Sequence, residues 1–342
     1  MKVKVTMLNV KDGDAIIVEL TKPKKALVMV IDSGDPTFYK NKMKAKLEAI
    51  LKSHNKKGPD VVVCTHYDSD HIGGLIPLIQ DYISEIKEVW IHKTPELLNG
   101  TIENEKPSEN FGFSILHDLF KNLEIPGNTL IADKANMLLR SLPQLKRLID
   151  LIPPSKLKQV FHKQNPLADW PEITILGPTK SYYNSLFPKD KTLEQFMLEE
   201  AIASTPSLTT EFNFVNKVIK NPCDSLKKDG ETKLTATNKA SILIAINKGT
   251  KRYLFTGDAG IESFKAVPDW QKELKNIYFL KIPHHGSNNN ISKELTALMQ
   301  PMYAYNSGFK YQDDEVIQCF GAKKRNKEVK STKTNGDLLF EK

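Results

Sequence analysis

The chain has 342 residues, of which 40% are apolar and 26% charged, as is ordinary for a globular protein with a sizeable core. It contains no run of about 18 apolar residues, which argues against a membrane span, and its first residues lack the apolar core of a signal peptide. The net charge of +8 favours acidic partners such as nucleic acid, although basic enzymes with other substrates are common. The three scattered cysteines, an odd number, predict reduced thiols and a cytoplasmic location.

Apolar runs and turn signals in the first part of the chain predict a mixture of strands and helices. Alternating or continuous apolar stretches predict strands near 2–8, 14–20, 26–31, 60–65 and 87–92. Apolar residues at helical spacing predict helices near 38–53 and 71–84. Cys64 lies in one of these strands, and we expect it in the core rather than on a metal, because free cysteine packs as a small hydrophobe.

A dense group of potential metal ligands follows the strand near 60–65, in the run Thr65-His66-Tyr67-Asp68-Ser69-Asp70-His71-Ile72-Gly73-Gly74. His66 and Asp68 are two residues apart and point the same way in an extended loop. Asp70 and His71 follow near the start of the next helix. Imidazoles and carboxylates packed this closely favour a cation between them, so the run predicts a metal site. The alternative is an ordinary polar loop after a strand.

The middle of the chain differs in character from both ends. Helical spacing interrupted by prolines predicts a helical insertion at about 95–170, and a stretch rich in Asn, Lys and Thr predicts a polar insertion at about 180–235. The helical insertion either forms a wall or lid over the site or is a packing appendage without a role in substrate choice.

Two later strands also end in residues of the ligand type. Strands are expected at 241–247, 251–255, 277–282 and 302–305, and a helix at 291–300. The second of these strands runs into Thr256-Gly257-Asp258, and the third into Pro283-His284-His285-Gly286-Ser287. Loops at one edge of an αβ structure meet, so we expect Asp258 and the two histidines to join the first motif. Each segment alone is also compatible with a turn or a surface loop.

Together, His-x-Asp-x-Asp-His-x-Gly-Gly, Thr-Gly-Asp and Pro-His-His-Gly-Ser resemble the pattern of the metallo-β-lactamase fold. The similarity is greatest to the branch found as the soluble domain of the bacterial competence DNA-uptake protein. Further similar segments are Asp12-Gly13-Asp14, Ile31-Asp32-Ser33-Gly34 and Asn238-Lys239-Ala240-Ser241. The resemblance covers about residues 1–93 and 236–342. It implies an αββα sandwich, two packed mixed sheets flanked by helices, in a single domain over 1–342 that carries both insertions.

The constellation predicts one or two divalent ions, either zinc or manganese, because about half of its ligands are carboxylates. One ion is expected on His66 and Asp68, with Asp258 as a bridge to a second ion. The second ion is expected on Asp70, His71 and His285. His284 is then free to bind substrate or to protonate a leaving group, which makes Asp70, Asp258 and His284 the predicted catalytic group.

Three departures from the general fold pattern bear on the site nearest His66. Asp68 stands where the pattern has a second histidine, and Gly177 stands where many members carry another. The segment 306–311 also lacks a histidine that relatives often have. We therefore expect this ion to be held weakly, or to be completed by water or substrate.

The predicted function is a metal-dependent phosphodiesterase or nuclease that acts on DNA or another nucleic acid through a metal-activated hydroxide. The alternatives are a hydrolase of small phosphoesters or lactones, and a protein that binds nucleic acid or a partner without cutting. Ser287 and Asn288 are candidates for orienting the reacting group, or plain turn residues. The densest basic cluster, Lys323, Lys324 and Arg325, is a candidate phosphate contact, or a solvated face.

Overall fold

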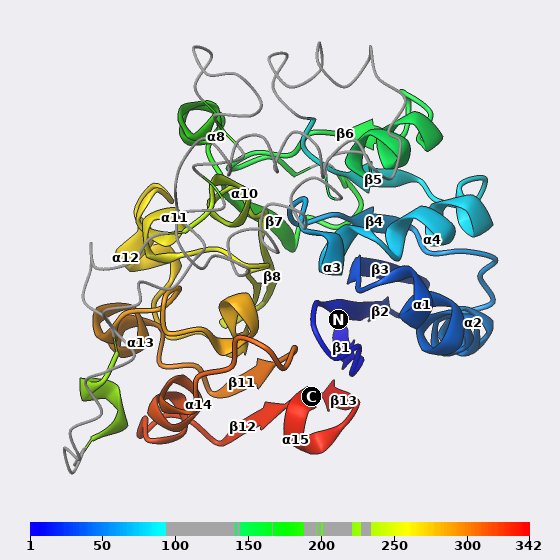
Figure 1. Ribbon diagram of the computed structural model, residues 1–342. Coiled ribbons are helices and arrows are strands. Elements are labelled where there is room, and N and C mark those ends of the chain that lie inside the picture. Colours follow the sequence, from blue (N-terminus) through cyan, green and yellow to red (C-terminus); the bar gives the residue numbers. More distant parts are fainter. Residues whose placement is uncertain are drawn as a thin grey trace.

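Two β-sheets packed face to face, with helices on both outer faces, form the protein in the computed structural model (Figure 1). The structure describes residues 1–93, 141, 144–165, 167–187, 196, 200, 221–226 and 234–342. This arrangement confirms the predicted αββα class.

The first sheet has seven strands in the order β13-β1-β2-β3-β4-β5-β6. Strands β3 to β6 run parallel, and β13, β1 and β2 complete the sheet by antiparallel pairing. The bounds are β1 (Lys2–Met7), β2 (Ala15–Lys22), β3 (Lys25–Ser33), β4 (Val61–Val63), β5 (Glu88–Trp90), β6 (Leu157–Lys158) and β13 (Leu338–Glu341).

The second sheet has six strands in the order β12-β11-β10-β9-β8-β7. Strands β9 to β12 run parallel, while β8 pairs antiparallel with β7 and β9. The bounds are β7 (Ile173–Gly177), β8 (Leu243–Lys248), β9 (Lys251–Phe255), β10 (Phe279–Lys281), β11 (Tyr303–Asn306) and β12 (Glu328–Ser331).

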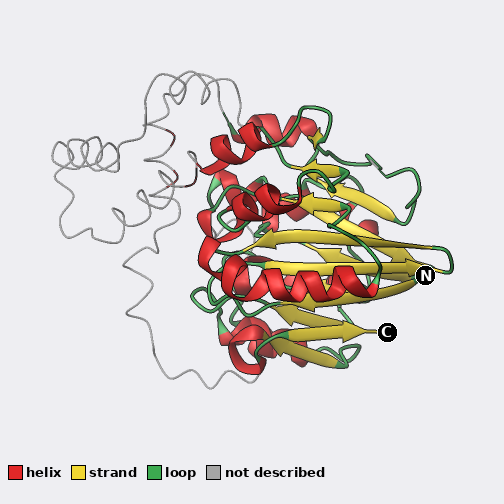
Figure 2. Cartoon of the chain, turned by 90° about the vertical axis from the view of Figure 1, so that its right-hand side faces the viewer, coloured by secondary structure: helices red, strands yellow, loops and turns green. Residues whose placement is uncertain are grey.

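Most of the helices are short and lie outside the sheets (Figure 2). Those before β7 are α1 (Pro36–Phe38), a π-helical turn (Tyr39–Met43), α2 (Lys44–Ser53), α3 (Ser69–Ile72) and α4 (Leu75–Tyr82). Those after β7 are α8 (Lys180–Leu186), α10 (Ala236–Lys239), α11 (Ile261–Lys265), α12 (Trp270–Glu273), α13 (Lys293–Met299), α14 (Asp314–Gly321) and α15 (Thr332–Asn335). Two 3₁₀ turns cover Pro222–Asp224 and Pro283–Gly286.

Strand β3 shows why the sequence folds into layers. Leu27, Met29 and Ile31 face the second sheet and join the core between the sheets, while Val28 and Val30 face the outer helices. Side chains alternate across a strand, so a strand that is apolar at every position is buried on both faces. The sandwich therefore has three apolar layers, one between the sheets and one under each helical face.

The predicted insertions lie largely outside the described residues. Within the first, residues 144–151 are helical as predicted, but Leu157–Lys158 form β6 at the edge of the first sheet. A two-residue strand has too short a pattern to show in the sequence. In the second, α8 and the turn Pro222–Asp224 are described. No helix among the described residues has the length and apolar character needed to cross a membrane.

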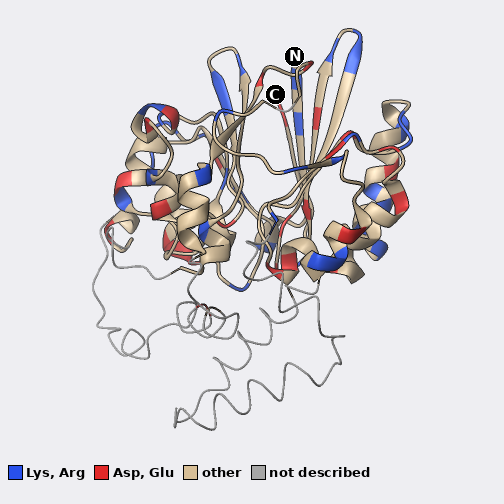
Figure 3. Cartoon of the chain, turned by 90° about the horizontal axis from the view of Figure 1, so that it is seen from above, with Lys and Arg blue, Asp and Glu red and all other residues tan. Residues whose placement is uncertain are grey.

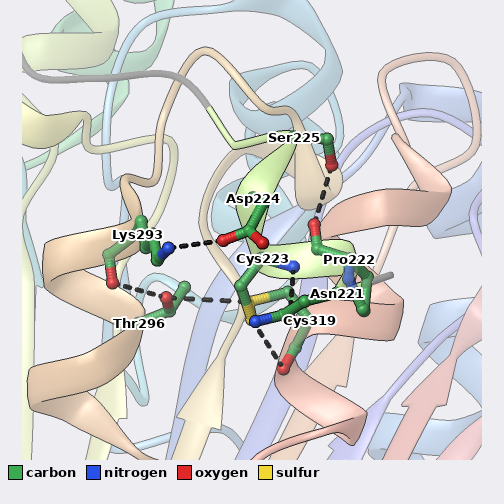
Figure 4. The surroundings of a disulfide bond; sticks show 8 residues. All are labelled: Asn221, Pro222, Cys223, Asp224, Ser225, Lys293, Thr296 and Cys319. Atoms are coloured by element: carbon green, nitrogen blue, oxygen red, sulfur yellow. Dashed lines mark hydrogen bonds and ion pairs between the residues drawn. A yellow bond between two sulfur atoms is a disulfide. The ribbon is translucent and has the colours of Figure 1, made fainter. Parts of the chain in front are cut away.

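The prediction of three reduced thiols is wrong. Cys223 and Cys319 form a disulfide that joins the turn Pro222–Asp224 to α14 (Figure 4). The two cysteines are 96 positions apart, so their pairing depends on a tertiary contact that spacing does not reveal. Cys64 is free and buried in the core, as predicted. The cytoplasmic location therefore loses the support that the thiols gave it.

Candidate metal centre

Four parallel strand ends meet at one edge of the sandwich. Strand β3 of the first sheet carries Asp32 next to its last residue, and β4 ends before His66. In the second sheet, β9 and β10 end before Asp258 and His284. The side chains that follow converge because parallel strands of a layered αβ fold present their carboxyl ends on one side. The structure thus brings the three predicted motifs together.

The carboxylate of Asp258 lies at the middle of this cluster. Its Oδ2 is 3.7 Å from Nε2 of His66, 3.4 Å from Nε2 of His71 and 3.5 Å from Nε2 of His285. It is also 3.6 Å from Nε2 of His284. One carboxylate oxygen therefore faces four imidazole nitrogens, which is the position expected of a bridging ligand.

The two other predicted carboxylates flank Asp258 on opposite sides. Asp68 Oδ2 is 3.7 Å from Nε2 of His66. Asp70 Oδ2 is 3.7 Å from Nε2 of His285 and 3.9 Å from Nε2 of His71. Asp68 thus lies near His66, and Asp70 lies near His285 and His71.

The imidazoles of His71 and His66 are oriented from behind by one buried carboxylate. His71 Nδ1 is 2.9 Å from Asp32 Oδ2, so it donates its proton there. Thr65 Oγ1 also donates to Asp32, at 2.5 Å, and lies 3.0 Å from His66 Nδ1, from which it accepts. Each ring therefore carries its proton on Nδ1 and turns the lone pair of Nε2 towards Asp258.

The other two histidines are held in the same sense by the loops around them. His285 Nδ1 donates to the carbonyl of Ser307 at 2.9 Å. His284 Nδ1 lies 2.7 Å from Oδ1 of Asn290, whose Nδ2 donates to the carbonyl of Asp258. Because that amide nitrogen is engaged, the oxygen faces His284 and accepts its proton. All four rings thus turn Nε2 to the same point, where it can take up a cation or a second proton.

These donor atoms fit a divalent cation. Within the part of the chain that the structure describes, Nε2 of His66, His71 and His285 is buried without a hydrogen-bond partner. Oδ1 of Asp68 and of Asp258 is in the same condition. Buried polar atoms are normally satisfied, so the three unpartnered imidazole nitrogens that face Asp258 Oδ2 indicate a group that takes up their lone pairs. Histidine nitrogens and carboxylate oxygens are ligands for zinc or manganese.

The electrostatics of the cluster show what replaces a cation when none is bound. Burial lowers the pKa of His71, but Asp258 and Asp70 outweigh it and hold this pKa well above its usual value of 6.5. The pKa of His285 is raised for the same reason, with Asp258 again the main opposing charge. Burial raises the pKa of Asp258, and the imidazoles of His71 and His285 reverse this and hold it well below its usual range. Protons on imidazole thus balance the carboxylates in the metal-free protein.

The backbone under the paired histidines is strained. His284 has φ 44° and His285 has φ 54°, in the left-handed region that side chains other than glycine rarely adopt. Such residues cost about 1–3 kcal/mol each and persist where the surroundings fix them, commonly at functional sites. Gly308, at φ 88°, is part of these surroundings, because a Cβ there would lie 2.3 Å from Nδ1 of His285. The strain indicates that the fold holds both rings in place.

The placement of His284 differs from the role predicted for it. The sequence suggested a ring free to bind substrate or to protonate a leaving group, and its Nε2 lies as close to Asp258 as those of the other histidines. Burial lowers its pKa, only partly opposed by Asp258, so the ring is neutral at neutral pH. A neutral ring with its proton on Nδ1 suits a ligand rather than an acid. The charge of Asp68 acts on this ring, which associates His284 with the set that lacked a partner.

Ser287 and Asn288 lie in the loop after the histidines and serve its structure. Ser287 Oγ accepts from the backbone of Asn289, and the backbone N–H of Asn288 donates to Asp313 at 2.6 Å. The side-chain amide of Asn288 donates to the carbonyl of Ser225. These contacts correspond to the turn-residue alternative.

The structure does not bring the basic cluster 323–325 to the metal centre. Arg325 donates to the carbonyls of Ile277 and Gln300, which precede β10 and β11. The centre lies beyond the other end of β10. Lys323 follows α14, which begins near the centre and runs away from it: the N–H of Asp313 donates to the carbonyl of Gly286.

Four residues near the cluster were not predicted as site residues. Asp14 and Asp32 are buried and stand in segments that the family resemblance had already marked. Lys281 is fully buried. The feature of the sequence that could have marked it is a charged residue between the apolar residues Leu280 and Ile282. The ring of Tyr311 lies 4.9 Å from that of His284. Burial and the charges of Asp70 and Asp68 raise its pKa, which keeps the phenol protonated.

Comparisons with known proteins agree with this fold. Residues 9–124 match the sequence model of the metallo-beta-lactamase superfamily. No curated protein matches the chain. Similar solved structures include the metallo-beta-lactamase fold protein YhfI from Bacillus subtilis, with 12% identity, a TM-score of 0.43 and 100% of both chains covered.

Two further solved structures are similar at the same low level. The dizinc quorum-quenching lactonase AidC has 13% identity and a TM-score of 0.35, over 84% of this chain and 66% of its own. The CmlA beta-hydroxylase has 10% identity and a TM-score of 0.47, over 98% of this chain and 54% of its own. Identities and TM-scores this low transfer no activity to this chain.

Proposed function

We propose that this chain hydrolyses phosphodiesters with divalent cations held around Asp258, because residues 9–124 match the model of the metallo-beta-lactamase superfamily, whose members are generally metal-dependent and hydrolytic. The observation that carries the proposal is the position of Asp258 Oδ2, which lies 3.4–3.7 Å from four imidazole nitrogens. Cations bound there would supply a water molecule of lowered pKa and positive charge for the departing oxygen.

The charge of the centre supports two cations rather than one. Five carboxylates, Asp14, Asp32, Asp68, Asp70 and Asp258, lie within it, and Lys281 is its one buried lysine among the described residues. When the imidazoles are neutral, the remaining four negative charges are balanced by two divalent ions. A single ion would leave two charges uncompensated in a buried site, which is costly.

Each set of residues has a distinct part in this proposal. His66, Asp68 and His284 would hold one ion, and Asp70, His71 and His285 the other, with Asp258 shared. Tyr311 borders the site from the loop after β11, so its protonated phenol can donate a hydrogen bond to a substrate oxygen. His284 is assigned here as a ligand rather than as a proton donor, because its Nε2 faces Asp258 Oδ2.

Nucleic acid is the proposed source of the phosphodiester, supported by the net charge of +8. Small phosphodiesters are the second candidate, and one observation favours them. Among the described residues, the basic cluster 323–325 and the lysines of the β2–β3 and β8–β9 hairpins lie away from the centre (Figure 3). A nuclease needs positive charge beside its site, whereas a small substrate does not.

The test is one preparation assayed in parallel on four substrates. Metal content is measured first, and hydrolysis of bis(p-nitrophenyl) phosphate, duplex and single-stranded DNA, and a γ-lactone is then followed with and without a chelator. We expect about two ions per chain and chelator-sensitive cleavage of the phosphodiesters. Turnover of the lactone alone would contradict the proposal, as would activity that persists without metal. Cleavage of the small diester without DNA cleavage would select the second candidate.

A further inference from the structure

Lys281, at the end of β10, is the only fully buried lysine among the described residues. Its Nζ lies 2.5 Å from Asp14 Oδ2 and donates to the carbonyl of Gly257 at 2.9 Å. A buried ammonium group is costly unless it is paired and hydrogen-bonded, and these contacts meet that need. Lys281 also lies behind the metal centre, where its charge acts on Asp258 as well as on Asp14.

The ammonium group also faces the central carboxylate. Lys281 Nζ lies 3.6 Å from Asp258 Oδ1, while Asp258 Oδ2 faces the four imidazoles. The two oxygens of one carboxylate are thus divided between a fixed positive charge and the ligand cluster. Because Oδ1 is attracted to Lys281, rotation of the carboxylate away from the cluster is opposed.

The same residue ties together the two loops that carry the ligands. Its side chain donates to Gly257, next to Asp258, and its own carbonyl accepts from Thr256 Oγ1 at 2.9 Å. His284 and His285 follow Lys281 by three and four residues in the same segment. Lys281 thus adds a side-chain tie between the loop of Asp258 and the paired histidines, which the N–H of His284 and the carbonyl of Gly257 also join.

We infer that Lys281 is a positioning residue that orients Asp258 as the shared ligand of the two cations. This inference rests on the proposed function, since it assigns a role within the same site. In this role Lys281 affects metal binding, and does not only compensate the buried charge of Asp14. Outer-sphere partners of this kind typically change metal affinity by about 10–100-fold.

A double variant separates the two roles. Lys281→Met alone leaves Asp14 charged and buried without its partner, so loss of folding would be uninformative. Lys281→Met with Asp14→Asn removes both charges, and two divalent ions still balance the remaining carboxylates. If Lys281 only neutralises Asp14, this variant should bind metal as the wild type does. If it positions Asp258, the folded variant should bind metal more weakly.

The measurement is titration of each purified, metal-free protein with zinc against a chromophoric chelator, together with the absorption spectrum of its cobalt-loaded form. We expect the double variant to keep its circular dichroism spectrum, to bind zinc about 10–100-fold more weakly and to show altered cobalt bands. Wild-type affinity and bands in the double variant would overturn the inference alone. Absence of zinc binding by the wild-type protein would overturn the proposed function and the inference with it.

Lys56→Met is the matched control, because Lys56 pairs with the buried Asp60 at the start of β4, away from the centre. It should lower stability and leave zinc affinity unchanged. If the double variant fails to fold, Lys281→Arg and Lys281→Gln, each combined with Asp14→Asn, take its place. The arginine keeps the charge and the donor, so it should bind zinc more tightly than the glutamine variant. Equal affinities would overturn the inference.

Discussion

At the edge where β3, β4, β9 and β10 end, carboxylates and imidazoles are packed within 4 Å of one another and fixed by hydrogen bonds from behind. At the opposite edge, the β2–β3 hairpin carries Lys22 and Lys25, which pair with partly exposed carboxylates and lie over the ring of Trp170. Figure 3 shows the lysines at these hairpin ends. Both edges are charged, but only the first buries its charges.

This difference in burial determines how much each charged pair contributes to the free energy of unfolding. Exposed ion pairs contribute about 0–1 kcal/mol, because water screens them and long side chains lose entropy. Removal of one member of a buried, hydrogen-bonded set costs about 3–5 kcal/mol, since it leaves a partner without compensation. The predictions below test this contrast, from the buried edge to the exposed one.

The largest effect is expected from Asp258→Asn. The amide keeps the shape of the side chain but removes the charge that faces all four imidazoles. We expect metal content to fall below one ion per chain and phosphodiester hydrolysis to fall by more than the roughly 100-fold that loss of an outer-sphere partner causes. Elemental analysis and initial rates measure both. An active variant with full metal content would remove Asp258 from the centre of the proposal.

The next largest effect is expected from loss of one histidine from either of the two ligand sets. His284 Nε2 faces Asp258 Oδ2 as closely as His66 Nε2 does, so the proposal gives the set of His66 and Asp68 a third ligand, in contrast to the expectation from sequence. His66→Ala and His71→Ala should therefore reduce metal affinity and rate to a similar degree. Zinc titration and steady-state kinetics provide the comparison. A much milder effect of His66→Ala would restore the view that its half is weak.

A smaller effect is expected from pH on metal binding. The raised pKa values of His71 and His285 mean that protons occupy these rings in the metal-free protein at neutral pH. Metal must displace them, so binding should release protons, and apparent affinity should rise with pH above about 6.5. Calorimetric titration in buffers of different ionisation enthalpy measures the released protons. Binding without proton release would show that the rings are already neutral.

The same shifts predict the stability of the metal-free protein. A histidine whose pKa is raised by folding stabilises the folded state below its unfolded pKa, and this stabilisation is lost as pH rises through the folded pKa. Because folding raises the pKa of both His71 and His285, the metal-free protein should lose stability above about pH 6.5. Added zinc should restore it, by about 2.7 kcal/mol at a free concentration of 100 times Kd. Urea unfolding at several pH values tests this.

The smallest effect is expected at the basic cluster. Lys323→Glu with Lys324→Glu should leave hydrolysis of a small phosphodiester unchanged, because these residues lie beyond the far end of β10. Arg325 is kept, since it donates to two backbone carbonyls and its loss would lower stability. If DNA reaches this face, only DNA binding and its salt dependence should weaken. A loss of small-diester hydrolysis would contradict the placement of the cluster.

Much of the fold was predictable because its signals are local. The run from Val61 to Gly74 contains a strand, a ligand-rich loop and the start of a helix in consecutive positions, and all three are present in the structure. The strands before Asp258 and His284 were found in the same way. Periodicity and ligand spacing are properties of neighbouring residues, so a single sequence reveals them.

The remaining features depend on contacts between distant segments. Nothing local marks Lys281 as the partner of Asp14, or Cys223 as the partner of Cys319, because the partners come from separate elements. The role of His284 also required the position of Asn290, which fixes the tautomer of the ring. Tertiary packing decides these roles, and the sequence pattern alone left them open.

The centre draws its ligands from both sheets, which makes it a reporter of folding as well as a chemical site. Residues 61–74 supply four ligand-type side chains, but Asp258 and His285, which complete the cluster, come from the second sheet. Strand pairing within either sheet does not assemble the cluster; docking of one sheet on the other does. The visible bands of a bound cobalt ion would therefore follow the moment at which the two sheets meet, a step that far-ultraviolet circular dichroism does not distinguish.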